Sequence, residues 1–277
     1  LQSKDGTTEH RTYQGHEGVS FYMASDYLNP INEITLKVIA CHGDLWKYRN
    51  SKIGSDRFAD IRDKNLVNLV NDFSKCDRGG SITNNKTIDL GKEIEFYDNF
   101  EKYNVDLPKL TILVGPSGVG KSTYTKSFDS SKFAIISRDN LVNELEGETY
   151  SDRFKLSIQA PHNNNIDNKL RNNFIYAIKN NKNIIVDMTC MTRKSRMKWI
   201  KLYKETCHRL FSDNEFGKSG HIDCVVVYNS YNNIIKNNIK RSQSSDKTIN
   251  ESIVLKQMRS FEYPKYSEGF NNIMLLF

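Results

Sequence analysis

Cysteine is scarce in this sequence, and its pattern excludes two common uses of that residue. The five cysteines among 277 residues are scattered, odd in number and never spaced as Cys-x-x-Cys, which argues against a disulfide framework and a zinc site. Long apolar runs are also lacking. No stretch approaches the roughly 20 apolar residues of a membrane-spanning helix, and the N-terminus contains no signal-peptide core. The sequence therefore predicts an intracellular protein, cytoplasmic or nuclear, without a membrane partner.

Excess positive charge is missing from the first part of the chain. Residues 1–107 contain 14 Lys and Arg against 17 Asp and Glu, a net charge of −3. Residues 108–277 contain 26 against 16, a net charge of +10. This asymmetry predicts two domains, 1–107 and 108–277, and a polyanionic partner for the second domain.

Short apolar strands alternate with helices from residue 110 onward. The expected strands are Leu110–Val114, Phe133–Ser137, Ile184–Asp187, Cys224–Tyr228 and Ile273–Leu276. This alternation predicts an α/β fold with a central parallel sheet flanked by helices. Residues 1–107 are interpreted as a smaller α+β domain. There, Ile34–Cys41 is expected to be a strand, and Asp56–Lys75 has the apolar spacing of an amphipathic helix.

The segment 115–122 reads GPSGVGKS and matches the P-loop pattern G-x-x-x-x-G-K-[ST]. It follows an expected strand and opens a helix, which is the context in which a P-loop cradles phosphates with backbone N–H groups. Lys121 is expected to reach the β- and γ-phosphates, and Ser122 to bind the metal ion. The pattern therefore predicts ATP and Mg²⁺ as cofactors. The expected nucleotide-binding residues are Gly115, Ser117, Gly118, Val119, Gly120, Lys121, Ser122 and Thr123.

Two carboxylates follow expected strands at the sheet edge that also carries the P-loop. Ligands of doubly wound sheets bind at this carboxyl edge. Asp139 could accept the proton of an attacking hydroxyl group, as a kinase base does, or could cap the following helix. Asp187 could be a Walker-B-like carboxylate, a group that positions the acceptor, or an ordinary residue at a strand end.

Two basic segments are candidates for contacts with the substrate. Arg193 and Arg196 begin a basic helix shortly after Asp187, so they are the members of that run expected nearest to the site, while the others favour a solvated helix face. Lys240 and Arg241 lie on a later expected helix. An arginine from a lid can neutralise charge on a phosphoryl group in transfer, whereas the alternative is a plain surface helix.

Together these pieces resemble the 5′-hydroxyl polynucleotide kinase family of P-loop phosphotransferases, from about Leu110 to Phe277. The P-loop, Ser-Arg-Asp at 137–139, the run IIVDMTCMTRKSRMKWI at 184–200 and the tail FEYP at 261–264 carry the resemblance. It implies a P-loop kinase fold, with Asp139 as general base and Arg241 as lid arginine beside Lys121. The candidate acceptor-side residues are Arg138, Asp187, Thr189, Arg193 and Arg196.

The resemblance has two departures on the acceptor side. Phage members of the family place an arginine three residues after the base to hold the 3′-phosphate of the acceptor, but Val142 occupies that position here. Cys190 stands where an asparagine is common. These departures leave the acceptor open among several classes of substrate.

The expected function is that of an ATP-dependent kinase that phosphorylates a hydroxyl of a nucleic acid, with the 5′-OH end of RNA or DNA as the leading acceptor, as in nucleic-acid repair. One alternative acceptor is a hydroxymethylated base of phage DNA, for which the missing arginine at Val142 would make sense. A small-molecule kinase would not need the basic surface. A non-catalytic ATP-binding regulatory module would not depend on Asp139. A phage or viral source is also open.

The role of residues 1–107 is less defined. Glu17–Val19 and Leu36–Val38 are similar to the last two motifs of nucleotidyltransferase ligases, but the motif with the lysine nucleophile is absent, so this part could not ligate by itself. It is therefore interpreted as the C-terminal part of a ligase-like or other fused domain, or as a small substrate-binding or structural domain. The chain begins with Leu1, from which we expect a segment of a larger nucleic-acid-processing protein.

Overall fold

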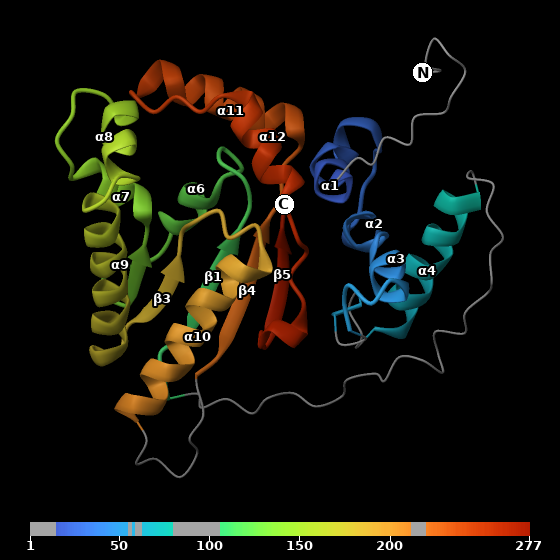
Figure 1. The fold of residues 1–277 in the computed structure, drawn as a ribbon, viewed down its shortest axis with the longest axis horizontal. Helices are drawn as coiled ribbons and strands as arrows, with labels where there is room; N and C mark the ends of the chain where they lie inside the picture. Colours follow the sequence, from blue (N-terminus) through green and yellow to red (C-terminus); the bar gives the residue numbers. More distant parts are fainter. Residues whose placement is uncertain (1–14, 55–56, 59–62, 80–105, 212–219) are drawn as a thin grey trace.

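A computed structural model describes residues 15–54, 57–58, 63–79, 106–211 and 220–277. Within them, five strands form one parallel sheet in the order β2-β3-β1-β4-β5 (Figure 1). The strands are β1 (Leu110–Val114), β2 (Phe133–Ile136), β3 (Asn183–Val186), β4 (Ile222–Val227) and β5 (Asn272–Leu276). The expected α/β fold with a central parallel sheet is confirmed, and each expected strand of residues 108–277 lies within two residues of its place.

Helices surround this sheet. In the second half of the chain they are α6 (Lys121–Thr125), α7 (Arg138–Asn143), α8 (Tyr150–Ser157), α9 (His162–Lys179), α10 (Arg193–Leu210), α11 (Tyr231–Ser244) and α12 (Glu251–Arg259). Helix α9 packs on β2 and β3, and α10 packs on α9. The pair α11 and α12 lies above the carboxyl ends of the strands (Figure 1). This edge of the sheet therefore has a helical cover.

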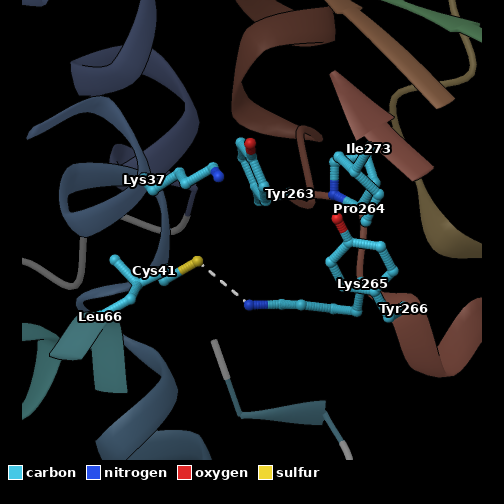
Figure 2. A pocket seen from close by; sticks show the side chains of 8 residues that line it. All are labelled: Lys37, Cys41, Leu66, Tyr263, Pro264, Lys265, Tyr266 and Ile273. Carbon is cyan, nitrogen blue, oxygen red and sulfur yellow. Dashed lines mark hydrogen bonds between the residues drawn. The ribbon is translucent and has the colours of Figure 1, made fainter. Parts of the chain in front are cut away.

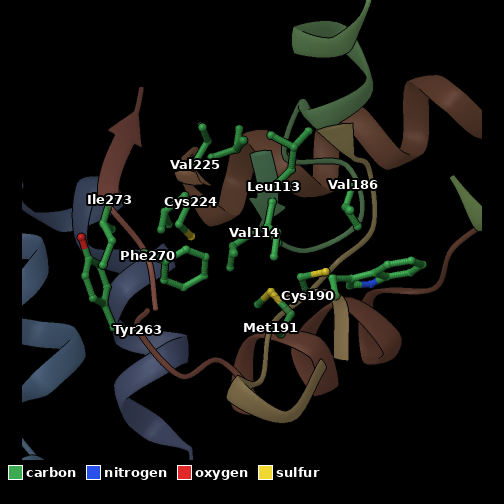
Figure 3. Close-up of a cluster of buried hydrophobic side chains, with 14 of the residues drawn as sticks. Leu113, Val114, Val186, Cys190, Met191, Cys224, Val225, Tyr263, Phe270 and Ile273 are labelled. Carbon is green, nitrogen blue, oxygen red and sulfur yellow. The ribbon is translucent and has the colours of Figure 1, made fainter. Parts of the chain in front are cut away.

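The core of the sheet is mostly apolar, as is typical of parallel strands covered on both faces. Every residue of β1 and β4 is buried. Figure 3 shows Val114 and Cys224 next to Phe270, which comes from the segment before β5. Burying one such side chain stabilises the fold by roughly 1.5–3 kcal/mol. This packing fixes the strand ends, and thereby the side chains that follow them.

Local capping sets where several helices begin. The side chain of Thr149 accepts a hydrogen bond from the amide of Asp152, whose carboxylate accepts one from the amide of Thr149, so α8 starts with a capping box. Ser230 caps α11 by accepting a hydrogen bond from the amide of Asn233. These caps satisfy amides that a helix start leaves without partners.

The first part of the chain differs from the expectation. Ile34–Cys41 is not a strand but lies in the helix α2 (Glu33–Cys41). Its β-branched residues favoured a strand, but short apolar runs do not distinguish a strand from a buried helix. Asn32 caps the helix, because its side-chain oxygen accepts a hydrogen bond from the amide of Thr35 at 2.8 Å. The described residues before 106 contain helices and no strand: α1 (His16–Tyr27), α2, α3 (Asp44–Arg49) and α4 (Lys64–Gly79).

The expected helix Asp56–Lys75 is found in part. Helix α4 begins at Lys64 and continues to Gly79, whereas residues 55–56 and 59–62 lie outside the described residues. The connector expected around 97–108 also lies mostly outside them. The boundary between domains 1–107 and 108–277 stays a prediction.

The helices of residues 15–79, here called the N-terminal helices, pack beside the sheet. Helix α1 contacts α11 and α12 (Figure 1). Phe21 lies 4.9 Å from Phe261 and 5.3 Å from Tyr228, measured between ring centroids, and is fully buried. The two parts of the chain therefore share an apolar interface. In the described part of the chain, no helix combines the length and the apolar character needed to cross a membrane.

Candidate active site

The P-loop connects β1 to α6 and lines a cavity of about 630 Å³ at the carboxyl edge of the sheet. Gly118 and Gly120 have backbone φ angles of 87° and 117°, in a region that L side chains rarely adopt. Six of the predicted nucleotide-binding residues line the cavity: Ser117, Gly118, Gly120, Lys121, Ser122 and Thr123. The other two, Gly115 and Val119, are buried behind it.

Lys121 is buried at the base of the loop. Its Nζ donates hydrogen bonds to the carbonyl oxygens of Gly115 at 2.8 Å and Pro116 at 2.9 Å. Burial lowers the pKa of this ammonium to about 8, although the nearby charge of Asp187 acts in the opposite direction. A phosphate in the cavity would give Lys121 an anionic partner in place of two carbonyl groups.

Ser122 and Asp187 lie together, as the shared sheet edge predicts. Ser122 Oγ donates a hydrogen bond to Asp187 Oδ2 over 3.0 Å, and both residues line the cavity. A hydroxyl and a carboxylate, completed by phosphates and water, are a usual donor set for Mg²⁺. The pair therefore fits the predicted magnesium ion. Among the described residues, no cluster of three or more His, Cys, Asp or Glu could hold a metal ion without such a substrate.

Asp139 is the second residue of α7 and faces the same cavity. Its Oδ1 accepts a hydrogen bond from the Tyr150 hydroxyl at 2.7 Å, and its Oδ2 forms an ion pair with Lys247. Burial alone would raise the pKa of Asp139, but the charge and hydrogen bond of Lys247, with the hydrogen bond from Tyr150, hold that pKa below its ordinary value. The carboxylate is therefore ionised at neutral pH and can accept a proton.

The opposite wall of the cavity comes from α11, α12 and the residues between them. Arg241, the expected lid arginine, lies there, with Lys240 one residue before it and Lys247 in the connecting segment. Thr189, another predicted site residue, also lines the cavity. Cationic groups from α11 and its connector thus face the P-loop across the cavity.

The expectation that Arg196 contacts the acceptor is wrong. Its side chain is fully buried and outside the cavity lining, so it is not a substrate-binding residue. Its guanidinium donates to both carboxylate oxygens of Glu268, at 2.7 and 2.8 Å, and to the carbonyl oxygens of Cys190 and Met191. It holds the loop after Asp187 against the segment before β5. Helical phase places it on the buried side of α10, which its charge alone did not reveal.

The two other predicted arginines have different places. Arg193 does not line the cavity, and its backbone amide donates a hydrogen bond to Glu262. Arg138 does line the cavity, but its guanidinium donates to Asp167 at 2.8 Å, to Asn163 at 2.7 Å and to the backbone carbonyl of residue 157. Arg138 thus connects α7 to α8 and α9. A contact of Arg138 with the acceptor stays a prediction.

The structure also brings in residues that the sequence analysis missed. They are Tyr150 and Phe154 of α8, Met188, Asn237, Lys247, Ile249, Ile253 and Gln257. Met188 directly follows Asp187 at the end of β3, whereas the others reach the cavity only because α8, α11, α12 and the segment between α11 and α12 fold over the sheet edge. The run of asparagines in α11 was visible in the sequence, but its contacts with the P-loop were not.

A family model described as an AAA domain matches residues 110–264, which is more than half of the chain. The chain belongs to the AAA domain family. This membership and the parallel sheet with its P-loop confirm the expected P-loop domain with a kinase-like fold. No curated relative matches the chain.

Several solved structures are similar to this AAA domain. A chain in the structure of the Pnkp1/Rnl/Hen1 RNA repair complex is 24% identical over 58% of this chain, with a TM-score of 0.45. The match spans 46% of that chain, less than half of its length. Kti12 of Chaetomium thermophilum, in complex with ADP-AlF3, is 14% identical over 60% of this chain and 88% of its own, with a TM-score of 0.41. A gluconokinase from Sinorhizobium meliloti is 12% identical over 61% of this chain and 82% of its own, with a TM-score of 0.36. These similarities identify no substrate for this chain.

Proposed function

We propose that this P-loop protein is an ATP- and Mg²⁺-dependent kinase that transfers the γ-phosphate to a hydroxyl of a nucleic acid, the 5′-OH end of RNA or DNA. The observation that carries the proposal is the position of Asp139. Its ionised carboxylate faces the same cavity as Lys121 and Ser122 of the P-loop, with Arg241 on the opposite wall. A base, a phosphate-binding loop and a lid cation around one cavity are the parts that phosphoryl transfer requires.

Asp139 would act on the acceptor. Its carboxylate accepts the proton of the attacking hydroxyl as the oxygen forms a bond to the γ-phosphorus and the bond to the β,γ-bridging oxygen breaks, which releases ADP. Lys121 and Arg241 would bind the phosphate oxygens, so that the attacking and leaving oxygens are held in line. The protein contributes position and charge more than covalent chemistry.

Ser122 and Asp187 would hold the magnesium ion. When bound, Mg²⁺ would neutralise the negative charge that develops on the phosphate oxygens. The hydrogen bond of 3.0 Å between these two side chains keeps both oxygens together at the cavity wall.

The charge of the domain favours a polyanionic acceptor over a small neutral one. Residues 108–277 carry the net charge of +10, and neutralising phosphates with Lys and Arg dominates binding to nucleic acids. Lys240, Arg241 and Lys247 stand on one wall of the cavity itself. A strand whose end enters the cavity would find these cations and Asp139 lining the same space.

The decisive experiment is a transfer assay with ATP labelled in the γ-phosphate. The acceptors are 5′-OH RNA, 5′-OH DNA, DNA with hydroxymethylated bases, and free nucleosides. The expected result is label at the 5′ end of RNA or DNA. Asp139→Asn should lower the transfer rate by about 10²–10⁴-fold, the usual contribution of a general base. Asp129→Asn, which changes an exposed carboxylate outside the cavity, is the control and should leave the rate unchanged.

Each other outcome assigns a different function. Label at internal positions of DNA would indicate a kinase of hydroxymethylated bases, and label on nucleosides alone a small-molecule kinase. ATP binding without transfer to any acceptor would indicate a regulatory module. Undiminished transfer by Asp139→Asn would remove Asp139 from the mechanism.

A further inference from the structure

Ser117, at the outer turn of the P-loop, is held by side-chain amides from two helices of the cover. Its backbone amide donates a hydrogen bond to Gln257 Oε1 at 2.8 Å, and its Oγ accepts one from Gln257 Nε2 at 3.3 Å. Its carbonyl oxygen accepts a hydrogen bond from Asn238 Nδ2 at 3.0 Å. Asn237 Nδ2 donates to the neighbouring carbonyl of Gly118, also at 3.0 Å. We call Asn237, Asn238 and Gln257 the P-loop clamp.

Asn238 approaches the loop so closely that only glycine fits beneath it. A Cβ atom on Gly118 would lie 2.4 Å from Asn238 Nδ2. Asn238 is itself 5% exposed, and a second hydrogen bond from its Nδ2 to the carbonyl of Ile234 fixes it to its own helix. The loop conformation and the position of α11 are therefore set together.

Gln257 depends on the position of α12, and α12 is supported from behind by α1. A Cβ on Gly18 would lie 2.0 Å from the carbonyl oxygen of Met258, and one on Gly15 would lie 2.0 Å from that of Arg259. These carbonyls belong to the two residues that follow Gln257. Glycine at both positions lets the backbones of α1 and α12 touch directly next to the clamp residue.

Further contacts fix the N-terminal helices against the rest of the domain. Tyr22 and Phe261 lie 5.5 Å apart between ring centroids, near the contact of Phe21 with Phe261. Figure 2 shows a second contact, where Lys265 reaches from the segment before β5 toward Cys41 of α2. Lys265 Nζ lies 3.0 Å from Cys41 Sγ and forms a buried ion pair of 2.7 Å with Asp44 Oδ2. The interface is thus apolar near α12 and charged near α2.

From these contacts we propose that the P-loop clamp positions the P-loop for ATP, and that the N-terminal helices position the clamp through α12. Gln257 is then a positioning residue that acts through Ser117. Docking of the N-terminal helices and nucleotide binding are coupled. The inference rests on nucleotide binding by the P-loop and is independent of the acceptor. It gives the N-terminal helices a role in nucleotide binding, although none of their described residues lines the cavity.

The physical basis is pre-organisation. A P-loop binds phosphates with several backbone amides at once, so fixing its outer turn beforehand reduces the ordering cost at the moment of binding. Coupling between two sites is reciprocal in free energy: if docked N-terminal helices strengthen ATP binding, bound ATP must strengthen their docking by the same factor. Typical couplings change affinity by roughly 5- to 150-fold.

The first test measures the affinity for Mg²⁺–ATP by calorimetry on the full chain. Gln257→Ala should weaken binding by at least about fivefold, because the amide of Ser117 loses its acceptor. Lys256→Ala is the matched control, since it changes the exposed neighbouring residue on the same helix, and it should leave the affinity unchanged. Where transfer activity is measured, Gln257→Ala should raise KM for ATP and leave kcat and its pH profile unaltered.

The second test separates coupling from a direct contact between Gln257 and ATP, because Gln257 also lines the cavity. Gly18→Ala should weaken ATP binding although Gly18 lies outside the cavity lining. When Gly18→Ala and Gln257→Ala are combined, the loss of ATP affinity should be no greater than the loss in Gln257→Ala alone. Additive losses would mean that the N-terminal helices do not act through Gln257, and would overturn the proposal.

Hydrogen exchange on the unaltered protein provides a test that does not depend on how Gly18→Ala folds. Mg²⁺–ATP should slow amide exchange in His16–Tyr27 as well as in the P-loop. Slowing confined to the P-loop would overturn the coupling. All these readouts use nucleotide binding, so a failure of the proposed polynucleotide kinase activity would leave them interpretable, and their failure would leave that activity untouched.

Discussion

Replacing Arg196 by methionine removes the charge at the centre of the buried network behind the site and keeps most of the side-chain volume. The Arg196 and Glu268 side chains are 0% and 1% exposed, and two hydrogen bonds of 2.7 and 2.8 Å connect them. The same guanidinium donates to the carbonyl oxygens of Cys190 and Met191. In Arg196→Met the Glu268 carboxylate would stay buried without its partner, and these carbonyls would lose a donor.

Breaking one partner of a buried ion pair costs about 3–5 kcal/mol of unfolding free energy. A cost of 1 kcal/mol lowers Tm by about 2–4 °C in a domain of this size, so Arg196→Met should lower Tm by about 6–20 °C. Arg196→Lys keeps the charge but loses the two-point hydrogen bond to Glu268, so it should fall between the parent protein and Arg196→Met. Lys194→Ala, an exposed change on the same helix, should have little effect.

Thermal and urea unfolding, followed by circular dichroism, measure these differences, and nucleotide and acceptor affinities are measured on the folded protein below the transition. A loss of stability confirms that Arg196 supports the loop after Asp187. If Arg196→Met unfolded like the parent and only bound the acceptor more weakly, the reasoning from burial would be refuted. Arg196 would then be the substrate-binding residue that its charge suggested.

Three further predictions concern the cavity. Burial lowers the pKa of Lys121 to about 8, so its ammonium deprotonates as pH rises through that value. Calorimetry should therefore show weaker ATP binding at pH 9 than at pH 7. For Lys121→Arg we expect an affinity for ATP that is weaker but does not depend on pH. Lys247→Met should raise the pKa of Asp139, and since the base must be ionised, the acid limb of the pH–rate profile should move to higher pH. A limb that stays in place would show that Lys247 does not act on the base. Gly118→Ala should weaken ATP binding at least about fivefold, because a side chain at φ 87° costs about 1–3 kcal/mol and its Cβ would meet Asn238; unchanged affinity would contradict the close approach.

The sequence predicted the features that depend on short segments. Gly115–Ser122 has the spacing of a P-loop, and the strand before it is an apolar run that ends where the turn must begin. Asp139 and Asp187 follow apolar strands of one parallel sheet, so the carboxyl ends of those strands bring them to one edge. Neither conclusion needed a side-chain packing arrangement.

The errors arose where burial or helix packing decided the outcome. Residues 34–41 have the composition of a strand, but their cap at Asn32 and the apolar surface of α1 and α4 favour a helix. Arg196 belongs to a basic run typical of a solvated helix face, yet its own side chain points inward to Glu268. A sequence pattern does not show which buried carboxylate forms an ion pair with which buried cation.

The sequence by itself determined the phosphate-binding loop, the short apolar strands and the ionisable groups that follow them, because each is a property of a few consecutive residues. Only the tertiary structure decided which cations face the cavity, which arginine is structural, and that Gln257 holds Ser117 while α1 supports Gln257. These are contacts between segments separated by 72 residues or more. They follow from how the helices pack over the sheet edge, and no local spacing encodes that packing.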